Sequence, residues 1–448
     1  MTIYLTIAAT LTIFAILTVW RKEWATWAGI AASVTLIAFA GFRYRTGYDW
    51  PAYEMIFAAV PELTGAVCDG IPRMDVLVEP LFLWLNIAIK TFGGGIETMI
   101  FVVAMINIAM VHVVVSRISK SMAIVWLVYF GLIFLVAQMA VLRQALASSF
   151  ALLALLLAVE KRPVSSVLSM IASTGFHITG AFFAPLLVLR RWRPVWWLPA
   201  AVIGVGVLAA ISGVSVAQTV IAAVSPMMPD WIAFKLTFYA ATKSAPISIG
   251  TAGLIGFHIV VLGVLYVAPT QKERHDPFVV MGIWVTIWVL VAHLFVSEMP
   301  IFWNRIMMVS IPWQIAAVYR LDAVRMAPLW LRGGSVAGLA VFSASALVYT
   351  LSAPSSAPYL PYQTVFEDHA DPSDARLKDA LSKSEYLPKG GGAQAMPEVA
   401  ADYGFASPSS GEKVEKPADQ SSPPGRACVI VSRMTASIEA IGKTIFAR

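Results

Sequence analysis

Charged residues and cysteines are scarce in this sequence. Asp, Glu, Lys and Arg make up 13% of its 448 residues, whereas hydrophobic residues make up 58% and the mean hydropathy is +0.75. Globular proteins carry about 25% charged residues, so this composition excludes an ordinary soluble enzyme. The two cysteines, Cys68 and Cys428, lie far apart in the sequence. They predict neither a disulfide framework nor a zinc site, and on this basis they receive no role.

Motifs for nucleotide, metal and hydrolase chemistry are missing as well. The chain contains no Walker loop, GxGxxG fingerprint, His/Cys cluster or GxSxG elbow, and we expect neither a cofactor nor a metal. The glycines of FGGGIE at 92–97 precede no lysine and predict a turn. Residues 1–352 hold the basic excess, with 22 Lys and Arg against 14 Asp and Glu. In a membrane protein such an excess requires no nucleic-acid partner.

Long apolar runs dominate what remains. A helix needs about 20 apolar residues to cross a hydrocarbon core of about 30 Å, and runs such as YLTIAATLTIFAILTVW and IETMIFVVAMINIAMVHVVV are of that order. They are continuously apolar rather than alternating, which excludes a β-barrel. The sequence predicts an all-α polytopic integral membrane protein with about 10–12 transmembrane helices. Spans are expected near 2–20, 24–42, 96–115, 122–138, 141–159, 195–222, 247–268, 278–296, 303–319 and 335–352.

Six short basic segments predict the orientation, because short cytoplasmic loops are rich in Lys and Arg. They are RKE at 21, SRISK at 116, EKR at 160, RRWR at 190, QKERH at 271 and YRLDAVRMAPLWLR at 319. All six lie on the cytoplasmic side only if 79–92 does not cross the membrane and 164–189 enters and returns. On this interpretation the N-terminus faces outward. The outer side also holds Arg143 and the loops at 43–78, 226–246 and 298–305.

Two segments are therefore expected to be irregular. Residues 79–92 are short for a span and fit a re-entrant or interfacial helix. Residues 164–189 are interrupted at Gly175-Phe176-His177, which favours a discontinuous helix that lines a cavity. One long tilted helix is the alternative for the second segment.

The composition changes after residue 352. Pro, Ser, Gly and charged residues then dominate, and few apolar residues remain to form a core. The sequence predicts a transmembrane domain at 1–352 and a largely disordered tail at 353–448.

Arginine beside aromatic or amide residues recurs on the expected outer side, in FRYRTGYDW, VLRQALASS and IFWNRIMM. Charges at this depth are costly and are functional by default. The guanidinium fork binds phosphate with two parallel N–H donors, so the three stretches predict an anionic ligand. The alternatives stay open. In these alternatives, Arg43 and Arg45 reach lipid head groups, Asp49 pairs with Arg45, and Glu79 caps the helix that starts at Pro80.

Four stretches, in order, resemble the EpsG-like family of bacterial exopolysaccharide and capsule polymerases, which are Wzy-type proteins. They are FRYRTGYDWPAYEMIF, EPLFLWLNIAIKTFG, VLRQALASSFALLALLLA and GFHITGAFF, with weaker similarity at NRIMM and PYLPYQTVF. The resemblance implies a GT-C-like architecture. It also implies a membrane glycosyltransferase that joins polyprenyl-pyrophosphate-linked oligosaccharide repeat units on the periplasmic face of the bacterial inner membrane. The extended C-terminal tail departs from a minimal member of this family.

The resemblance assigns chemical roles to the polar residues, because a departing pyrophosphate needs fixed positive charge. Asp49 or Glu79 is the candidate base for the acceptor hydroxyl, and His177 at the expected helix break is the third catalytic candidate. The candidate substrate-binding residues are Arg43, Arg45, Tyr53, Arg143, Gln144, Asn304 and Arg305.

The expected partners are the lipid-linked oligosaccharide, the bilayer, and a flippase and a chain-length regulator of the same export pathway. A transporter or flippase of lipid-linked sugars is the main alternative, because broken helices and buried arginines also suit transport. Inverted repeats would favour it, and residues 1–160 and 195–352 share no visible repeat. An outer-facing acyltransferase is a third hypothesis, which usually needs a catalytic histidine on a polar loop.

Overall fold

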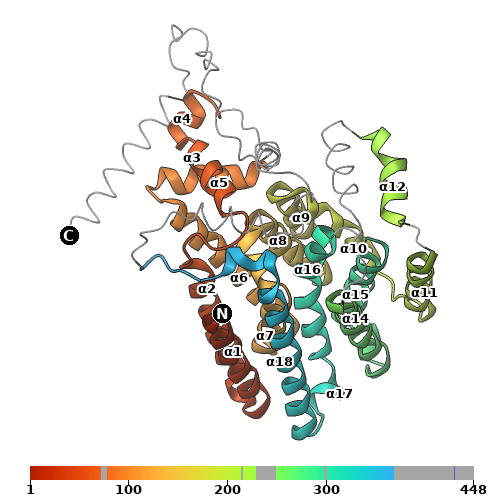
Figure 1. The fold of residues 1–448 in the computed structure, drawn as a ribbon. Helices are drawn as coiled ribbons and strands as arrows, with labels where there is room; N and C mark the ends of the chain where they lie inside the picture. Colours follow the sequence, from red (N-terminus) through yellow and green to blue (C-terminus); the bar gives the residue numbers. More distant parts are fainter. Residues whose placement is uncertain (72–77, 213–214, 229–248, 297–299, 368–427, 429–448) are drawn as a thin grey trace. The chain divides into compact units, whose positions relative to one another are not determined.

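The computed structural model describes residues 1–71, 78–212, 215–228, 249–296, 300–367 and 428 (Figure 1). Of this part 81% is helical, and it contains no strand. Eight of its helices are long and apolar enough to cross a membrane. The protein is therefore an all-α polytopic membrane protein, as the apolar runs predicted.

The chain divides into two compact units, which we describe separately. Unit 1 comprises residues 1–38 and 105–352, and unit 2 comprises 39–104 and 353–448. Helices α2 (Ala25–Gly41) and α6 (Ile96–Ile118) contribute residues to both. The remaining helices of unit 1 are α1 (Thr2–Trp20), η1 (Lys22–Trp24), α7 (Met122–Tyr129), the π-helix η2 (Phe130–Ala140), α8 (Leu142–Val159), α9 (Pro163–Phe176), the 3-10 helix η3 (Ile178–Phe183), α10 (Ala184–Leu189), α11 (Trp197–Ser212), α12 (Val216–Val224), η4 (Ser225–Met227), α14 (Ile249–Val267), η5 (Glu273–His275), α15 (Pro277–Phe295), α16 (Pro300–Val318), α17 (Asp322–Arg325) and α18 (Leu329–Ser352).

Unit 1 is a bundle of packed helices. Helices α1, α7 and α18 lie side by side (Figure 1), and α16 packs against both α7 and α8. Almost every side chain of α7 and α8 is buried. A buried hydrogen bond, 2.7 Å from Trp126 Nε1 to Ser33 Oγ, joins α7 to α2. Close packing and paired polar groups thus stabilise a bundle whose helices are nearly all apolar.

The six basic segments gather at one end of unit 1. Arg117 Nη1 lies 3.1 Å from Glu160 Oε1, and Arg320 donates both to Asp276 Oδ2 and to the carbonyl of Ile118, each at 2.8 Å. The Asp322 N–H donates to Glu273 Oε1 at 2.6 Å, which joins the segments at 319 and 271. Arg193 donates to the Arg274 carbonyl at 2.5 Å, which joins the segments at 190 and 271. Gly333 directly follows the segment at 319, and Trp20 directly precedes the segment at 21. A Cβ on Gly333 would lie 3.9 Å from Trp20 Nε1, so these two segments are also close together. The segments thus share one end of unit 1, as the prediction that they lie on one side of the membrane requires.

The irregular path of residues 163–189 is also confirmed. Helix α9 ends at Phe176, His177 is extended, and η3 and α10 lead back toward Arg190. Arg162 and Arg193 flank this segment, and both belong to the basic end described above. Residues 163–189 therefore enter the bundle and return to the end at which they started, instead of forming one tilted helix.

One expected span differs in the structure. The run at 195–222 forms two helices, α11 and α12, rather than one. The outer loop at 226–246 lies largely outside the described residues. Residues 80–91 form the short helix α5, which at 12 residues and about 1.5 Å per residue cannot span a bilayer. This agrees with the expectation that 79–92 does not cross.

Unit 2 contains α3 (Trp50–Ala59), α4 (Leu63–Cys68), α5 (Pro80–Thr91) and the 3-10 helix η6 (Pro354–Tyr359). Its chain segments at 39–44 and 362–365 lie side by side. Arg43 and Thr364 form an antiparallel bridge, and the Tyr362 hydroxyl donates to the Phe39 carbonyl at 2.7 Å. Residues 353–367 are thus folded. Apart from Cys428, the rest of 353–448 lies outside the described residues, and its disorder and the boundary at 352 stay predictions.

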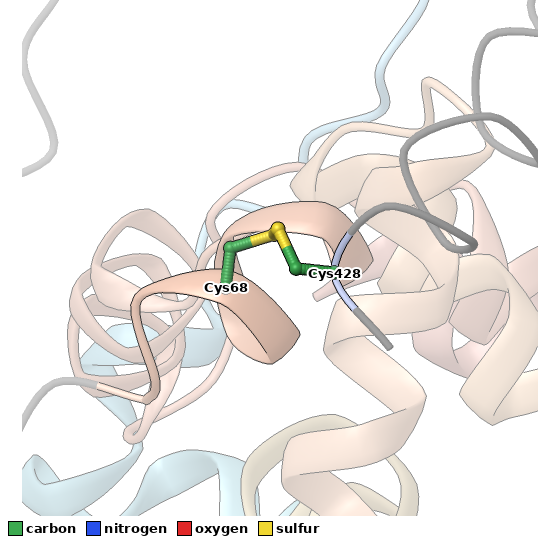
Figure 2. Close-up of a disulfide and its surroundings, with 2 residues drawn as sticks. All are labelled: Cys68 and Cys428. Carbon is green, nitrogen blue, oxygen red and sulfur yellow. A yellow bond between two sulfur atoms is a disulfide. The ribbon is translucent and has the colours of Figure 1, made fainter. Parts of the chain in front are cut away.

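The two cysteines form a disulfide (Figure 2). Cys68 at the end of α4 is bonded to Cys428, with 5.0 Å between their Cα atoms. The expectation that they imply no disulfide is wrong. Spacing does not reveal the pair because 360 residues separate the two positions, and only the folded chain brings them within reach.

Candidate functional site

Arg143 and Gln144 lie in the first turn of α8. This helix begins where the π-helix η2 ends, and Val141, whose backbone is not helical, separates the two. Gln144 is buried, whereas Arg143 is half-buried and also has a partner. A helix N-terminus favours negative charge because of its unpaired N–H groups and its dipole. An arginine in this turn adds to that field.

Gln144 connects α8 to the broken segment that contains His177. Its Nε2 donates to Thr179 Oγ1 at 3.2 Å, and the same hydroxyl lies 2.9 Å from His177 Nδ1. The backbone N–H of Thr179 also donates to Nδ1, at 3.2 Å, so that His177 is the N-cap of η3. The structure therefore brings two predicted site residues, Gln144 and His177, into one hydrogen-bond network. Thr179 completes it and was not predicted.

Asn304 and Arg305 lie near the start of α16, and both are half-buried. Helix α16 packs on α8, and Ser148 Oγ on α8 lies 3.6 Å from Met308 Sδ on α16. Arg143 precedes Ser148 by five residues, and Arg305 precedes Met308 by three. At a rise of about 1.5 Å per residue, the positions of the two arginines along the helix axes differ by about 3 Å. They occupy one layer of unit 1, toward the end opposite the basic segments.

Arg43 is fully buried in unit 2, with 0% of its surface exposed. Its guanidinium donates to the backbone carbonyls of Ala40 and Thr46, the latter at 3.2 Å from Nε. Burial raises the pKa of Tyr362 to about 12, and the charge of Arg43 limits that rise. An arginine that reaches lipid head groups keeps its guanidinium exposed at the membrane surface. The buried guanidinium of Arg43 therefore does not fit that alternative.

Arg45 precedes α3, Asp49 is its N-cap residue, and Tyr53 lies in its first turn. Arg45 Nε is 2.9 Å from Glu54 Oε1, and its guanidinium also lies over the Tyr44 ring. The residue adopts a positive φ of 39°, which is uncommon for a side chain other than glycine. Asp49 is the N-cap residue of α3, although its side chain makes no capping hydrogen bond. Tyr53 is 3% exposed and packs on Phe82, 5.7 Å between ring centres, so it contributes to the core of unit 2.

Glu79 is the N-cap residue of α5, and its side chain makes no capping hydrogen bond either. At the other end of α5, Lys90 Nζ donates to the carbonyls of Phe57, Ala58 and Val60. These are the last carbonyls of α3, which a cation stabilises. Sequence reasoning did not identify Lys90 as the residue that joins the two helices.

Two histidines from different helices are neighbours in unit 1. The rings of His258 and His293 lie 5.3 Å apart between α14 and α15, and His258 Nδ1 is 3.2 Å from Gln314 Oε1. Helical spacing does not reveal this pair, because the two residues come from different helices. In the part of the chain that the structure describes, His, Cys, Asp and Glu do not gather in threes as a metal site would require.

The predicted site residues thus fall into two groups. Arg143, Gln144, His177, Asn304 and Arg305 belong to unit 1, and Arg43, Arg45, Asp49, Tyr53 and Glu79 belong to unit 2. Within unit 1 the geometry places Arg143 and Arg305 in one layer and links Gln144 to His177 through Thr179. Within unit 2 it places Arg43 and Tyr53 in the interior and the two carboxylates at helix starts.

A family model for the EpsG family matches residues 26–364, which is more than half of the chain and includes every predicted site residue. The match ends at Thr364, the bridge partner of Arg43. No curated protein and no solved structure matches the chain.

Proposed function

The chain belongs to the EpsG family, and on this premise we propose that it is a polysaccharide polymerase. It would join polyprenyl-pyrophosphate-linked oligosaccharide repeat units on the periplasmic face of the bacterial inner membrane. The observation that supports this most directly is the layer formed by Arg143 and Arg305, since two guanidinium forks on adjacent helices suit a pyrophosphate.

The reaction is a glycosyl transfer. A hydroxyl oxygen of the acceptor unit attacks the anomeric carbon of the donor sugar, and the bond from that carbon to the phosphate oxygen breaks. The electron pair leaves with the lipid pyrophosphate, and the hydroxyl proton passes to a base. Fixed donors aimed at the departing oxygen stabilise charge that develops in the transition state, which is the role we give to Arg143 and Arg305.

Asp49 and Glu79 are the candidate bases in unit 2. Each precedes a helix with proline in its first turn, and neither side chain caps that helix. The alternative in which Glu79 serves as a cap therefore has no support in the hydrogen bonds of α5. A carboxylate within hydrogen-bond reach of the acceptor hydroxyl would contribute about two to four orders of magnitude in rate.

Two observations support the orientation. Basic loops favour the cytoplasmic side, and the six basic segments share one end of unit 1. Helices α2 and α18 each begin at a basic segment and are long enough to cross the membrane, so we place their C-terminal ends outside the cytoplasm. Cys68 and Cys428 form a disulfide, and disulfides persist in oxidising compartments such as the periplasm.

Purified protein with its lipid-linked repeat unit tests the proposal. A polymerase converts the substrate into a ladder of longer products and releases one lipid pyrophosphate for each glycosidic bond that it forms. A flippase of lipid-linked sugars would instead move the substrate across a vesicle membrane and form no glycosidic bond. Transport without a ladder, or neither activity, would contradict the proposed function.

A further inference from the structure

The hydrogen bonds at His177 specify which ring nitrogen carries the proton. The backbone N–H of Thr179 donates to Nδ1 at 3.2 Å, and a backbone N–H can only donate. Nδ1 must therefore present its lone pair. A neutral imidazole has one N–H and one lone pair, so the proton of neutral His177 resides on Nε2.

Thr179 and Gln144 reinforce this tautomer. The Thr179 hydroxyl accepts from Gln144 Nε2 at 3.2 Å and lies 2.9 Å from His177 Nδ1. Because Gln144 supplies a donor to the hydroxyl oxygen, the hydroxyl proton is directed toward Nδ1. Gln144 and Thr179 are both buried, with 2% and 5% of their surface exposed, so water does not readily replace either contact.

The tautomer decides which chemistry His177 can perform. A general base must offer a lone pair to the proton it removes, and the only lone pair of neutral His177 is occupied by Thr179. Protonating Nδ1 would also disrupt the N-cap of η3. Nε2–H, by contrast, is a hydrogen-bond donor of the kind that stabilises an anionic oxygen.

The hydrogen-bond network of His177 extends to the first turn of α8. Gln144 is adjacent in sequence to Arg143, and both lie in the first turn of α8, where the helix dipole favours an anion. We propose that His177 donates a hydrogen bond from Nε2 to the pyrophosphate of the lipid-linked donor, and that Thr179 and Gln144 are positioning residues that hold it in this tautomer. This inference rests on the proposed function and gives the catalytic candidate at position 177 the role of a hydrogen-bond donor.

Two amide substitutions of His177 give a matched test. The side-chain N–H₂ of glutamine reaches the position of Nε2, whereas that of asparagine occupies the position of Nδ1. With purified protein and lipid-linked repeat unit, we expect His177→Gln to keep kcat within about tenfold of the parent and His177→Asn to lose about a hundredfold. Thermal unfolding in detergent shows whether both variants are folded to the same extent.

Thr179 is tested through the pair Thr179→Ser and Thr179→Val. Serine keeps the hydroxyl and should retain kcat within about twofold, whereas valine should lower kcat by about tenfold with KM unchanged. Equal activity of the valine variant and the parent would overturn the positioning role. A loss that serine does not rescue would also overturn it.

The tautomer itself has a spectroscopic readout that does not depend on activity. In protein labelled with ¹⁵N-histidine, the His177 signals are identified by their loss in His177→Gln, and their shifts distinguish Nε2–H from Nδ1–H. A proton on Nδ1 would overturn the inference. Two results together would also overturn it: equal losses of kcat in the glutamine and asparagine variants, and a fall in the parent's kcat below about pH 6.5 that is absent from both variants. If the parent itself forms no polymer, the proposed function fails and the spectrum still reports on the tautomer.

Discussion

Gly180 lies directly against Ser173, where η3 returns along α9. A Cβ on residue 180 would overlap Ser173 Oγ and lie 2.7 Å from its backbone carbon and 2.9 Å from its backbone oxygen. Ser173 is itself held by a hydrogen bond from Oγ to the Ala147 carbonyl of α8, at 2.6 Å. The return of the chain after His177 therefore depends on the absence of a side chain at position 180.

We expect Gly180→Ala to displace η3 and to destabilise the protein by about 1–3 kcal/mol, as overpacking does. Because η3 carries Thr179, polymer formation should fall as well. Gly338→Ala on α18 is the matched control, since a Cβ there has no neighbour within 4 Å. Thermal unfolding in detergent and polymer yield provide the measurement. Equal melting temperatures for the two variants would contradict the close packing.

The shared layer of Arg143 and Arg305 predicts the effect of lysine at each position. Lysine keeps the charge but lacks the guanidinium fork. Arg→Lys should lower kcat/KM at either position by about tenfold or more, equivalent to about 1.4 kcal/mol, while the melting temperature stays near that of the parent. Arg43→Lys provides the contrast. Its guanidinium is buried on backbone carbonyls, so this variant should lose stability. Parent activity in both Arg143→Lys and Arg305→Lys would remove the two arginines from the site.

The disulfide predicts a redox-dependent thiol count. The chain has two cysteines, so unfolded, unreduced protein should bind no alkylating reagent and reduced protein should bind two equivalents. In intact cells, a reductant and a thiol reagent that cannot cross the inner membrane should together label both positions, because we place them outside the cytoplasm. Cys68→Ser should leave Cys428 reactive without reduction. Labelling that requires permeable reagents would overturn the orientation.

Glu273 predicts how stability changes with pH at the basic end. Burial alone would raise the pKa of this carboxyl, but hydrogen bonds from the Asp322 backbone and from Thr270, together with nearby Arg325, lower it below its usual value of 4.5. A lowered pKa stabilises the folded state above pH 4.5, and this stabilisation disappears as the pH falls through the folded-state pKa. The melting temperature of the parent should therefore exceed that of Glu273→Gln by a constant amount above about pH 5. The difference should shrink below pH 4.5, and a difference that grows toward acid would contradict this assignment.

Much of the fold could be predicted from local pattern. The apolar runs that became α1, α2, α6, α8 and α15 were expected within a few residues of their observed bounds. The proline that opens α5 and the interruption before His177 marked the two segments that do not cross. These signals depend only on neighbouring residues. The run at 195–222 was misjudged because a continuous apolar stretch does not reveal a break between two helices.

The candidate site could be predicted only as a set of residue types. Arg143, Gln144 and His177 stood out because charge and a broken helix are conspicuous in an apolar sequence. Thr179 did not, since a single threonine beside a glycine resembles any turn. Arg43 and Arg45 looked alike in FRYRTG, yet the structure buries one on carbonyl groups and pairs the other with Glu54. Which environment each arginine enters depends on residues far away in the chain.

The sequence by itself determined that this protein is an all-helical membrane protein, that its basic segments share one side, and that it resembles one family. Hydropathy and charge are local properties, and the bilayer imposes a uniform rule on them. Only the tertiary structure decided that Arg143 and Arg305 share a layer, that Cys68 meets Cys428, and that the Thr179 backbone N–H donates to His177 Nδ1. Each of these depends on atoms brought together from distant parts of the chain, because hydrogen bonds and disulfides form only over a few ångströms.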